Sequence, residues 1–331
     1  MSSPVTPLRF FDAVNGYQRT AVVKAALDLD VFSHIAGGSE TAREIAGGCD
    51  ASERGVRVLC DALTVLGMLE KQEGRYRLTA DSALFLDRGS PSYIGASVEY
   101  LCGQMQTEGF AQFTEAVRRG GTALGSEGCL APDHPAWAHF ARSMTGVMRP
   151  LAEFVAAEAG PVQRVLDVAC GHGLYAIALA EANESAEVYA LDWPHVLDVA
   201  QRHARQAGVA SRFHLIPGNA FTTAFGAGYD VIVLANFLHC LDSGAAVQMA
   251  RMCHAALKPG GRLLVVAFVP DAARTRPSAS AWFATVMLAT TPGGDAYTKG
   301  EYDAMLAGAG FPSCRLVEIP GSAEHLLIAT K

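Results

Sequence analysis

The fold of this chain is decided by Val165-Leu166-Asp167-Val168-Ala169-Cys170-Gly171-His172-Gly173-Leu174, an apolar stretch that runs into two glycines. The stretch reads as a short strand, a turn, and the first residue of an Ala- and Leu-rich helix. Gly171 and Gly173 let a ligand approach the backbone at a helix N-terminus, where free N–H groups favour a carboxylate or a phosphate. Two glycines are weak evidence by themselves, because Ala176 also satisfies the tolerant form of the dinucleotide-binding motif.

Acidic residues around this turn distinguish between ligand classes. The carboxylate of Asp167 would repel a pyrophosphate but attract the ammonium group of an amino acid. A second predicted strand ends at Asp192, about 20 residues after the glycines, where a carboxylate can accept both ribose hydroxyls of an adenosine. The alternative for Asp192 is a helix-capping role before Pro194. The exit loop of the third strand, residues 217–221, is placed to meet the adenine.

The strand–turn–helix pattern repeats from Gly160-Pro161 to the end of the chain. Predicted strands cover residues 163–168, 187–191, 212–216, 229–235, 262–269, 314–319 and 325–330. The first five alternate with helical stretches, which predicts a Rossmann-like, doubly wound α/β fold with a mostly parallel seven-stranded sheet. Only Pro320-Gly321 and a few neighbours separate the last two strands, so we expect a hairpin and one antiparallel edge strand.

The first hundred residues predict helices followed by a small hairpin, which is a winged-helix pattern. Apolar positions recur at helical spacing over residues 16–32, and two capping-box starts stand at Thr41–Glu44 and Asp50–Glu53. Alternating strands at 69–72 and 75–78 flank a Glu-Gly turn. The helix that would enter a DNA groove carries acids beside its two arginines and so lacks a basic face. We therefore expect a structural or dimerising role, and a winged-helix regulator is the remote alternative.

We predict three segments from this reading. Residues 1–95 form a winged-helix-like dimerisation domain, 96–160 a helical connecting segment that contributes to the substrate pocket, and 161–331 the ligand-binding α/β domain. The connecting segment carries methionines and aromatic residues on its apolar faces, including Met144. Such a stripe is more often core, but methionine also suits an adaptable apolar pocket.

Composition limits the partners. Against 26 Lys and Arg the chain has 33 Asp and Glu, a net charge of −7 with no concentrated basic segment, which argues against nucleic acid and anionic membranes. None of the eight cysteines forms a C-x-x-C pair, so reduced thiols are expected. The start of the sequence does not resemble a signal peptide, and no apolar run approaches the ~18 residues of a membrane span. We expect a soluble, cytoplasmic protein.

Five motifs in order give the chain a family resemblance. They are Asp167-x-Ala-Cys-Gly-x-Gly, Asp192, Gly218-Asn219-Ala220-Phe221, Leu234-Ala235-Asn236-Phe237-Leu238-His239 and Leu257-Lys258-Pro259-Gly260-Gly261. Together they resemble the small-molecule O-methyltransferases of the caffeate, hydroxyindole and bacterial polyketide-tailoring type. The resemblance covers nearly the whole chain, including the winged-helix dimerisation domain. It implies the class I methyltransferase fold, a homodimer, a small-molecule acceptor and S-adenosyl-L-methionine as cofactor, with no metal.

The resemblance also implies cofactor-binding residues. Gly171 and Gly173 would hold the methionine part, and Asp192 the ribose. Met144 stands where the family places a methionine that packs near the cofactor and the substrate. Asn219 and Ala220 would lie beside the adenine, although the family usually carries Asp where this chain has Asn219. An amide oxygen can still accept a hydrogen bond from the adenine amino group.

His239 stands at the position of the family's general base, and its ordinary pKa near neutrality suits proton removal from a hydroxyl. The alternative is a structural histidine at a strand end. The supporting carboxylates of the plant enzymes are missing, because Phe268 and Ala296 occupy the two glutamate positions. Asp295 is adjacent to the second position and is the candidate for orienting His239.

Several functions stay open at this point. The leading one is methyl transfer to a hydroxyl of an aromatic or polyketide-like small molecule, which is an in-line displacement that depends on positioning. Transfer to carbon, nitrogen or sulfur on the same scaffold is the close alternative. A cofactor-binding family member with a non-methylating reaction is a more distant one.

Overall fold

A computed structural model describes residues 5–132 and 134–331, and the chain divides into two compact units after Val98. The helical segment that we assigned to residues 96–160 is not a separate body. All but its first three residues belong to the same unit as the large sheet.

The N-terminal unit is mainly helical and contains the predicted hairpin. Its helices are α1 (Leu8–Val14), α2 (Gly16–Asp28), α3 (Val31–Ala36), α4 (Ala42–Gly48), α5 (Glu53–Val65), α6 (Ala80–Phe85) and the 3-10 turn η1 (Gly95–Ser97). Strands β1 (Leu69–Gln72) and β2 (Arg75–Leu78) pair antiparallel. A bridge between Thr41 and Arg75 ties the start of α4 to the hairpin. The winged-helix pattern is therefore present.

Two details of this unit differ from the sequence prediction. The helix expected over residues 16–32 is interrupted, because Asp30 adopts a left-handed conformation with φ of 57°. The helix expected to start at Asp50 is capped by Ser52, whose side chain accepts the Gly55 N–H. The other predicted start is confirmed, since Thr41 and Glu44 form a complete capping box.

Two of the apolar residues that recur at helical spacing over residues 16–32 are in the core of this unit. Leu27 and Val31 are buried together with Phe32, Ile45 and Tyr76. Exposed large apolar side chains occur on α1 and the start of α2, at Leu8, Phe10, Phe11, Val14 and Tyr17, and also elsewhere in this unit, for example at Val58, Val65 and Leu84. No residue of α1 is buried.

The second unit begins with helices and continues into the sheet domain. The helices before the sheet are α7 (Val98–Leu101), α8 (Gln104–Ala111), α9 (Phe113–Arg119), η2 (Gly128–Leu130), α10 (Ala136–Ser143) and α11 (Thr145–Ala159). Those among and after the strands are α12 (Leu174–Ala182), α13 (Pro194–Gln206), η3 (Ala210–Arg212), η4 (Leu238–Cys240), α14 (Ser243–Ala256), α15 (Ser278–Thr290) and α16 (Lys299–Gly308).

Seven strands form one sheet in the order β5-β4-β3-β6-β7-β9-β8. They are β3 (Arg164–Val168), β4 (Glu187–Asp192), β5 (Phe213–Pro217), β6 (Tyr229–Ala235), β7 (Leu257–Phe268), β8 (Cys314–Glu318) and β9 (Glu324–Thr330). The mostly parallel seven-stranded sheet is confirmed. The expected hairpin is confirmed, and the edge strand β8 pairs antiparallel with β9. Strand β9 lies inside the sheet, where it also pairs antiparallel with β7.

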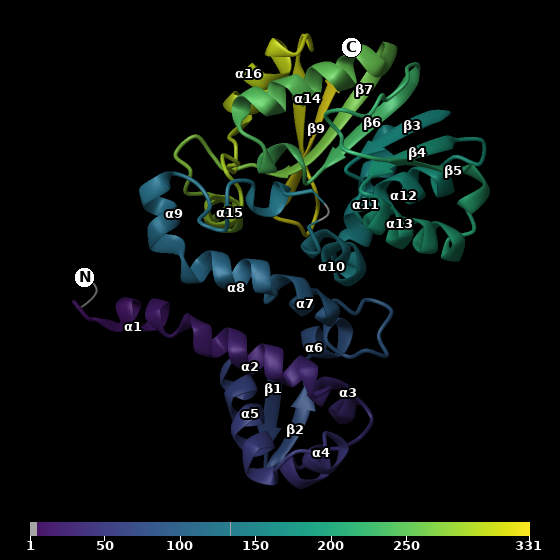
Figure 1. Cartoon of the computed structure of the whole chain (residues 1–331). Coiled ribbons are helices and arrows are strands. Elements are labelled where there is room, and N and C mark those ends of the chain that lie inside the picture. Colours follow the sequence, from purple (N-terminus) through teal and green to yellow (C-terminus); the bar gives the residue numbers. More distant parts are fainter. Residues whose placement is uncertain (1–4, 133) are drawn as a thin grey trace. The chain divides into compact units, whose positions relative to one another are not determined.

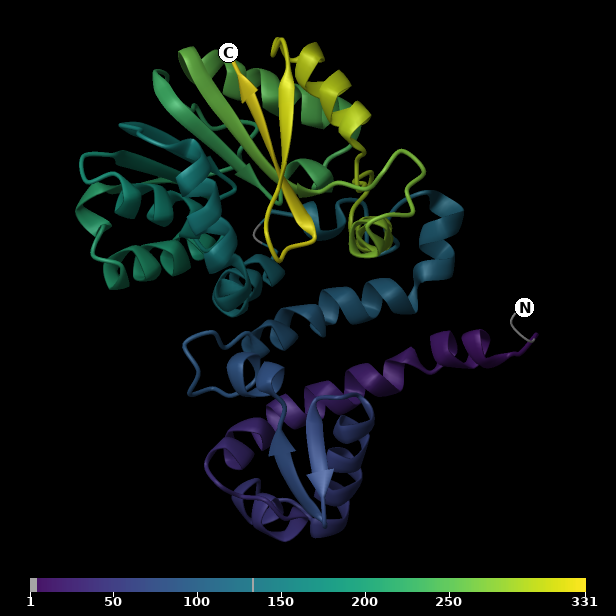
Figure 2. The ribbon, with the colours of Figure 1, turned by 180° about the vertical axis from the view of Figure 1, so that it is seen from behind.

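Helices cover both faces of this sheet (Figures 1 and 2). α11, α12 and α13 pack on one face, where Val165, Val188 and Val231 are fully buried. α14 and α16 pack on the other face over Leu166, Ile232 and Leu263. Strands buried on both faces are near-continuous apolar runs, as the sequence shows for β3 and β6.

The strand order reverses direction between β3 and β6. β4 and β5 extend the sheet on one side of β3, and β6 and β7 extend it on the other. In doubly wound folds the crevice at this switch point, outside the carboxyl ends of the strands, is where ligands bind. The loops after β3, β4 and β6 are those that carry the predicted site residues.

Candidate active site

The glycine turn after β3 has the backbone that only glycine tolerates well. Gly171 has φ of 56° and Gly173 has φ of 73°. A Cβ at Gly173 would lie 3.0 Å from the Cβ of Ala200 on α13. A Cβ at Gly171 would instead meet the ring of Phe140 at 3.5 Å. The turn is therefore in contact with α13 at Gly173 and with α10 at Gly171. Gly173 is also the N-cap of α12, which begins directly after the turn.

Asp167 lies beneath this turn and is fully buried. One carboxyl oxygen accepts the Ala176 N–H of α12 at 3.3 Å, and the other, Oδ1, has no partner among the described residues. Burial raises the pKa of Asp167 to about 8, and the Asp192 charge adds to that rise. An unpaired buried carboxyl oxygen fits a cationic donor such as an amino-acid ammonium group.

Asp192 connects the end of β4 to the glycine turn. Its Oδ2 accepts the Gly171 N–H at 2.8 Å, and its Oδ1 accepts the Trp193 N–H at 2.7 Å. Trp193, not Asp192, is the N-cap of α13, so the capping alternative is wrong. Burial raises the pKa of Asp192 to about 6. The two hydrogen bonds act in the opposite direction and lower this pKa, but burial has the larger effect.

The remaining predicted cofactor residues lie on the neighbouring loops. The Asn219 Oδ1 accepts the Phe221 N–H at 2.8 Å, which shapes the loop after β5, and Ala220 is buried. Met144 is buried at the N-cap of α11 in the core between α11, α12 and the sheet. The cofactor-binding roles of Asn219, Ala220 and Met144 stay predictions.

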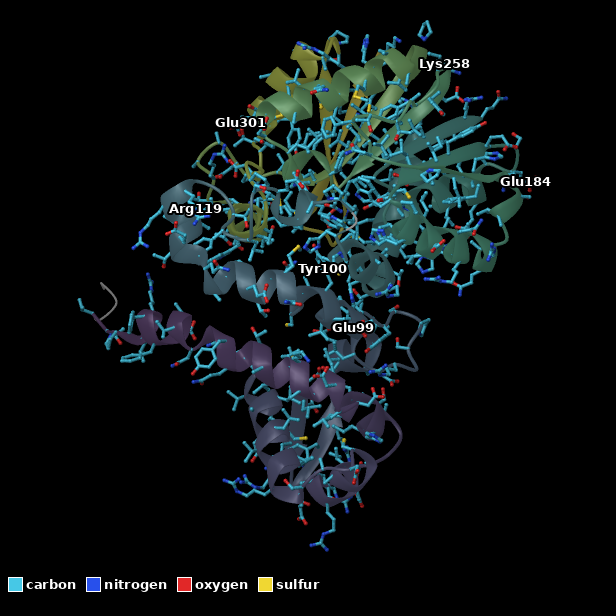
Figure 3. The ribbon with its side chains drawn as sticks, in the orientation of Figure 1. Glu99, Tyr100, Arg119, Glu184, Lys258 and Glu301 are labelled. Atoms are coloured by element: carbon cyan, nitrogen blue, oxygen red, sulfur yellow. The ribbon has the colours of Figure 1, made fainter. Side chains whose placement is uncertain are left out.

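An aromatic group covers the glycine turn, and the sequence interpretation did not single it out. The Phe140 ring stacks on His172 with centroids 5.7 Å apart, and Tyr100 meets Phe140 edge-on at 5.1 Å. Tyr100 comes from α7, at the start of the helical segment (Figure 3). Burial raises the pKa of Tyr100, so its hydroxyl stays protonated at neutral pH. This segment therefore contributes flat apolar surface beside the turn.

His239 lies in η4, directly after β6, and is buried. Its ring meets the Phe283 ring edge-on at 4.6 Å and lies 6.4 Å from that of Phe268. The two phenyl rings stack on each other at 4.0 Å. Within the described ranges the Nδ1 of His239 has no hydrogen-bond partner, and burial lowers the pKa of the imidazole to about 3. The histidine is therefore neutral at physiological pH.

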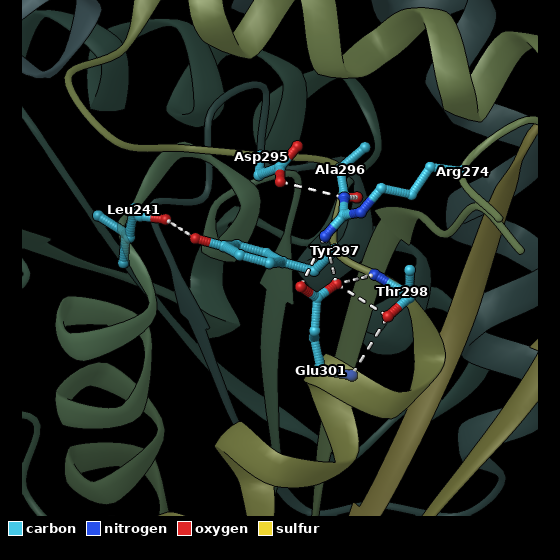
Figure 4. A network of polar contacts seen from close by, with 7 residues as sticks. All are labelled: Leu241, Arg274, Asp295, Ala296, Tyr297, Thr298 and Glu301. Atoms are coloured by element: carbon cyan, nitrogen blue, oxygen red, sulfur yellow. Dashed lines mark hydrogen bonds and ion pairs between the residues drawn. The ribbon is translucent and has the colours of Figure 1, made fainter. Parts of the chain in front are cut away.

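Asp295 reaches His239 through its backbone only. Its N–H donates to the His239 carbonyl at 2.9 Å. Its carboxylate instead pairs with Arg274 at 3.1 Å, in the network of Figure 4 that also contains Glu301. The contact that we expected between this carboxylate and the imidazole is absent from the structure. A guanidinium is a stronger partner for a carboxylate than a buried neutral imidazole.

Two further polar residues at this edge were missed. Asn236 directly follows β6, and its Nδ2 donates to Glu324 Oε2 at 3.2 Å. Glu324 is the first residue of β9, and its Cα partner on β7 is Phe268. Burial raises the pKa of Glu324 to about 7. The predicted Pro-Gly hairpin was the available signal, because an antiparallel strand brings its first residue to the edge where parallel strands end.

Other classes of site receive no support. In the part of the chain that the structure describes, no group of three or more His, Cys, Asp or Glu side chains is arranged to hold a metal ion. No helix in the described ranges combines the length and apolar character needed to cross a bilayer. In the winged helix, Arg57 pairs with Asp61 and Arg43 with Glu53, so these arginines do not form an uncompensated basic face.

The family model of the O-methyltransferase domain matches residues 132–312, more than half of the chain. The chain belongs to the O-methyltransferase family. A second family model, for the O-methyltransferase dimerisation domain, matches residues 11–88. This methyltransferase therefore has the family's two-domain organisation, and the family's methyl donor is S-adenosylmethionine.

Known relatives match nearly the whole methyltransferase chain. The 3-hydroxy-5-methyl-1-naphthoate 3-O-methyltransferase of Streptomyces sahachiroi is 28% identical over 98% of this chain and 94% of its own. The acetylserotonin O-methyltransferase of Rattus norvegicus is 28% identical over 96% of this chain and 75% of its own. A solved structure from Nostoc punctiforme, assigned to the O-methyltransferases, is 44% identical with a TM-score of 0.96 and covers 99% of this chain and 100% of its own.

Proposed function

We propose that the protein transfers the methyl group of S-adenosylmethionine to a hydroxyl of an aromatic small molecule. The observation that carries the proposal is the neutral His239 imidazole, held against the Phe268 and Phe283 rings at the carboxyl edge of the sheet. Aromatic rings favour a flat apolar acceptor by stacking. The names of the Streptomyces sahachiroi and rat relatives both specify methyl transfer to oxygen, which supports the same accepting atom here.

The residues around the glycine turn suit the cofactor. The positive-φ glycines leave backbone accessible for the methionine carboxylate, and the unpaired Oδ1 of Asp167 suits its ammonium group. Asp192 would hold the ribose, and Asn219 with Ala220 would border the adenine. When bound, the cofactor supplies an electrophilic methyl group on a sulfonium.

The chain's own contribution to the chemistry is positioning and proton acceptance. The aromatic rings would hold the acceptor in line with the methyl group and exclude water. A ring nitrogen of His239 would receive the hydroxyl proton. Because burial lowers the pKa of His239 to about 3, this histidine is a weak base, and the geometry suits an acidic phenol better than an alcohol.

A direct assay tests the proposed reaction. Incubation of the protein with S-adenosylmethionine and a panel of phenols should yield S-adenosylhomocysteine and a methyl ether in equal amounts by mass spectrometry. A product methylated at carbon, nitrogen or sulfur would show that the accepting atom is not a hydroxyl oxygen. Cofactor binding without any methylated product across the panel would favour a non-methylating reaction.

We also propose that the protein is a homodimer held by its N-terminal unit. The exposed apolar side chains of α1 support this arrangement, because contiguous apolar surface of this kind marks an interface. The match to the dimerisation domain supports it independently.

Light scattering at micromolar concentration should therefore give the mass of two chains. The double substitution Leu8→Glu and Phe11→Glu should reduce it to the mass of one, because two carboxylates would be buried without partners. Val117→Glu, at an exposed valine of α9 in the other unit, is the matched control and should leave the dimer intact. A monomer mass for the unsubstituted protein would contradict the proposal.

A further inference from the structure

The pair of Asn236 and Glu324 is not used by the reaction proposed above, although it lies at the same edge of the sheet. Asn236 follows β6 directly, and His239 is three residues further along the same turn. Glu324 lies across from Phe268, whose ring contacts His239. The pair is therefore adjacent to the proposed catalytic histidine from two different strands.

The hydrogen bond between the two residues fixes which way the amide points. The amide NH₂ of Asn236 faces Glu324, at 3.2 Å between Nδ2 and Oε2, and the ionised form of the Glu324 carboxylate can only accept this hydrogen bond. The backbone carbonyl of Asn236 is also engaged, since it accepts from the Cys240 thiol at 3.7 Å. Because Nδ2 faces Glu324, the amide oxygen, Oδ1, points away from Glu324.

That oxygen is left without a donor. Asn236 Oδ1 is inaccessible to solvent and has no hydrogen-bond partner in the described part of the chain. Buried amide oxygens are nearly always paired, because leaving one unpaired loses the hydrogen bond that water would have made. The Nδ1 of His239 is unpaired in the same way. Two unsatisfied polar atoms on one turn at a ligand-binding edge indicate a ligand with matching polar groups.

The backbone at Asn236 supports a dedicated role. Asn236 has φ of 54°, in the left-handed region where few residues other than glycine and asparagine occur. The backbone N–H of Asn236 donates to the Val266 carbonyl on β7 at 2.9 Å, so the conformation is held by the sheet. The carboxamide is thereby presented from a rigid strand end.

We propose that Asn236 determines acceptor specificity, by accepting a hydrogen bond from a second hydroxyl next to the one that is methylated. Glu324 acts as a positioning residue that holds the amide. Because the two unpaired atoms belong to residues three apart on one turn, they suit donors on neighbouring ring positions. The inferred substrate class is an aromatic ring with adjacent hydroxyls, and this inference rests on the proposed function.

The test compares an aromatic 1,2-diol with the matched monohydroxy compound. The unsubstituted protein should favour the diol in kcat/KM by about ten-fold, the effect of one hydrogen bond to a buried amide. Asn236→Gly retains the left-handed backbone at no steric cost and should remove this preference by raising KM for the diol alone.

Variants of Glu324 separate positioning from charge. Glu324→Ala should remove the preference, because the amide loses its anchor. Glu324→Gln should retain it, because the glutamine carbonyl can still accept from Asn236 Nδ2. An equal loss of kcat/KM for both compounds in Asn236→Gly would overturn the inference. So would weakened S-adenosylmethionine binding in that variant, which would assign Asn236 to the cofactor.

Binding measurements distinguish this inference from the proposed reaction. Calorimetry should show tighter binding of the diol than of the monohydroxy compound, in the presence of S-adenosylhomocysteine and only when Asn236 is intact. If the diol binds in this way but is not methylated, the proposed reaction fails and the inferred recognition stands. If the protein methylates both compounds but binds them equally, the inferred recognition fails and the reaction stands.

Discussion

Replacing Asp192 by alanine is expected to weaken S-adenosylmethionine binding by about ten- to a hundred-fold, the value of a lost charged hydrogen bond. Two effects act in the same direction. The variant loses the carboxylate proposed to accept the ribose hydroxyls. It also loses the acceptor for the Gly171 N–H, which holds the glycine turn to the end of β4. Titration calorimetry measures the dissociation constant directly.

Asp198→Ala is the matched control, because Asp198 is an exposed aspartate on α13, six residues from Asp192. It should bind the cofactor like the unsubstituted protein. Affinity should also depend on pH, since burial raises the pKa of Asp192 to about 6. The carboxylate is ionised above that value and becomes protonated as the pH falls through it, so binding should weaken below pH 6. Asp192→Asn should lack this dependence. Unchanged affinity in Asp192→Ala would remove Asp192 from the cofactor site.

The parts of the fold that the sequence predicted well are those encoded locally. β3, β4 and β6 are short apolar runs between turns, and each predicted range agrees with the observed strand within one residue at either end. The glycine turn is equally local, because Gly171 and Gly173 both have positive φ, and a Cβ at Gly173 would also lie too close to Ala200. Spacing along the chain is sufficient information for such elements.

The errors concern contacts between distant parts of the chain. The hairpin of β8 and β9 is local in sequence and was predicted, but which of the two strands lies at the edge depends on the further pairing of β9. Its other partner, β7, is about 60 residues earlier, and that pairing places β9 inside the sheet. The same long-range pairing brings Glu324 beside Phe268. A glutamate in a predicted loop gives no indication that it will be buried, so Glu324 was missed.

For Asp295, the sequence indicated where the residue lies but not where its carboxylate points. Its position next to the family's glutamate site correctly indicated proximity to His239, since the Asp295 N–H contacts the His239 carbonyl. The direction of its carboxylate depends on Arg274, 21 residues earlier in the chain, to which it pairs at 3.1 Å. Phe283 was missed for a related reason, because an aromatic residue in a helix is more often core than binding surface.

His239→Ala is expected to lower kcat by about 10²–10⁴-fold, the usual contribution of a general base, with cofactor affinity nearly unchanged. Because burial lowers the pKa of His239 to about 3, the imidazole is already neutral from pH 5 upward. Lowering the pH from 8 to 5 should therefore not protonate it. The pH profile of kcat should follow ionisation of the phenol that is used as acceptor, and should shift when a more acidic phenol replaces it.

Asp295→Ala is the informative comparison for His239→Ala, because it keeps the main-chain hydrogen bond to the His239 carbonyl and removes only a carboxylate that Arg274 already holds. Its kcat should stay within about three-fold of the unsubstituted protein, as expected for removal of an exposed ion pair. A loss as large as that of His239→Ala would give the Asp295 carboxylate a catalytic role in the bound state. Full activity in both single variants and in the double variant would mean that no side-chain base is needed. The reaction would then depend on positioning between the aromatic rings alone, and an accepting atom other than oxygen would become the better assignment.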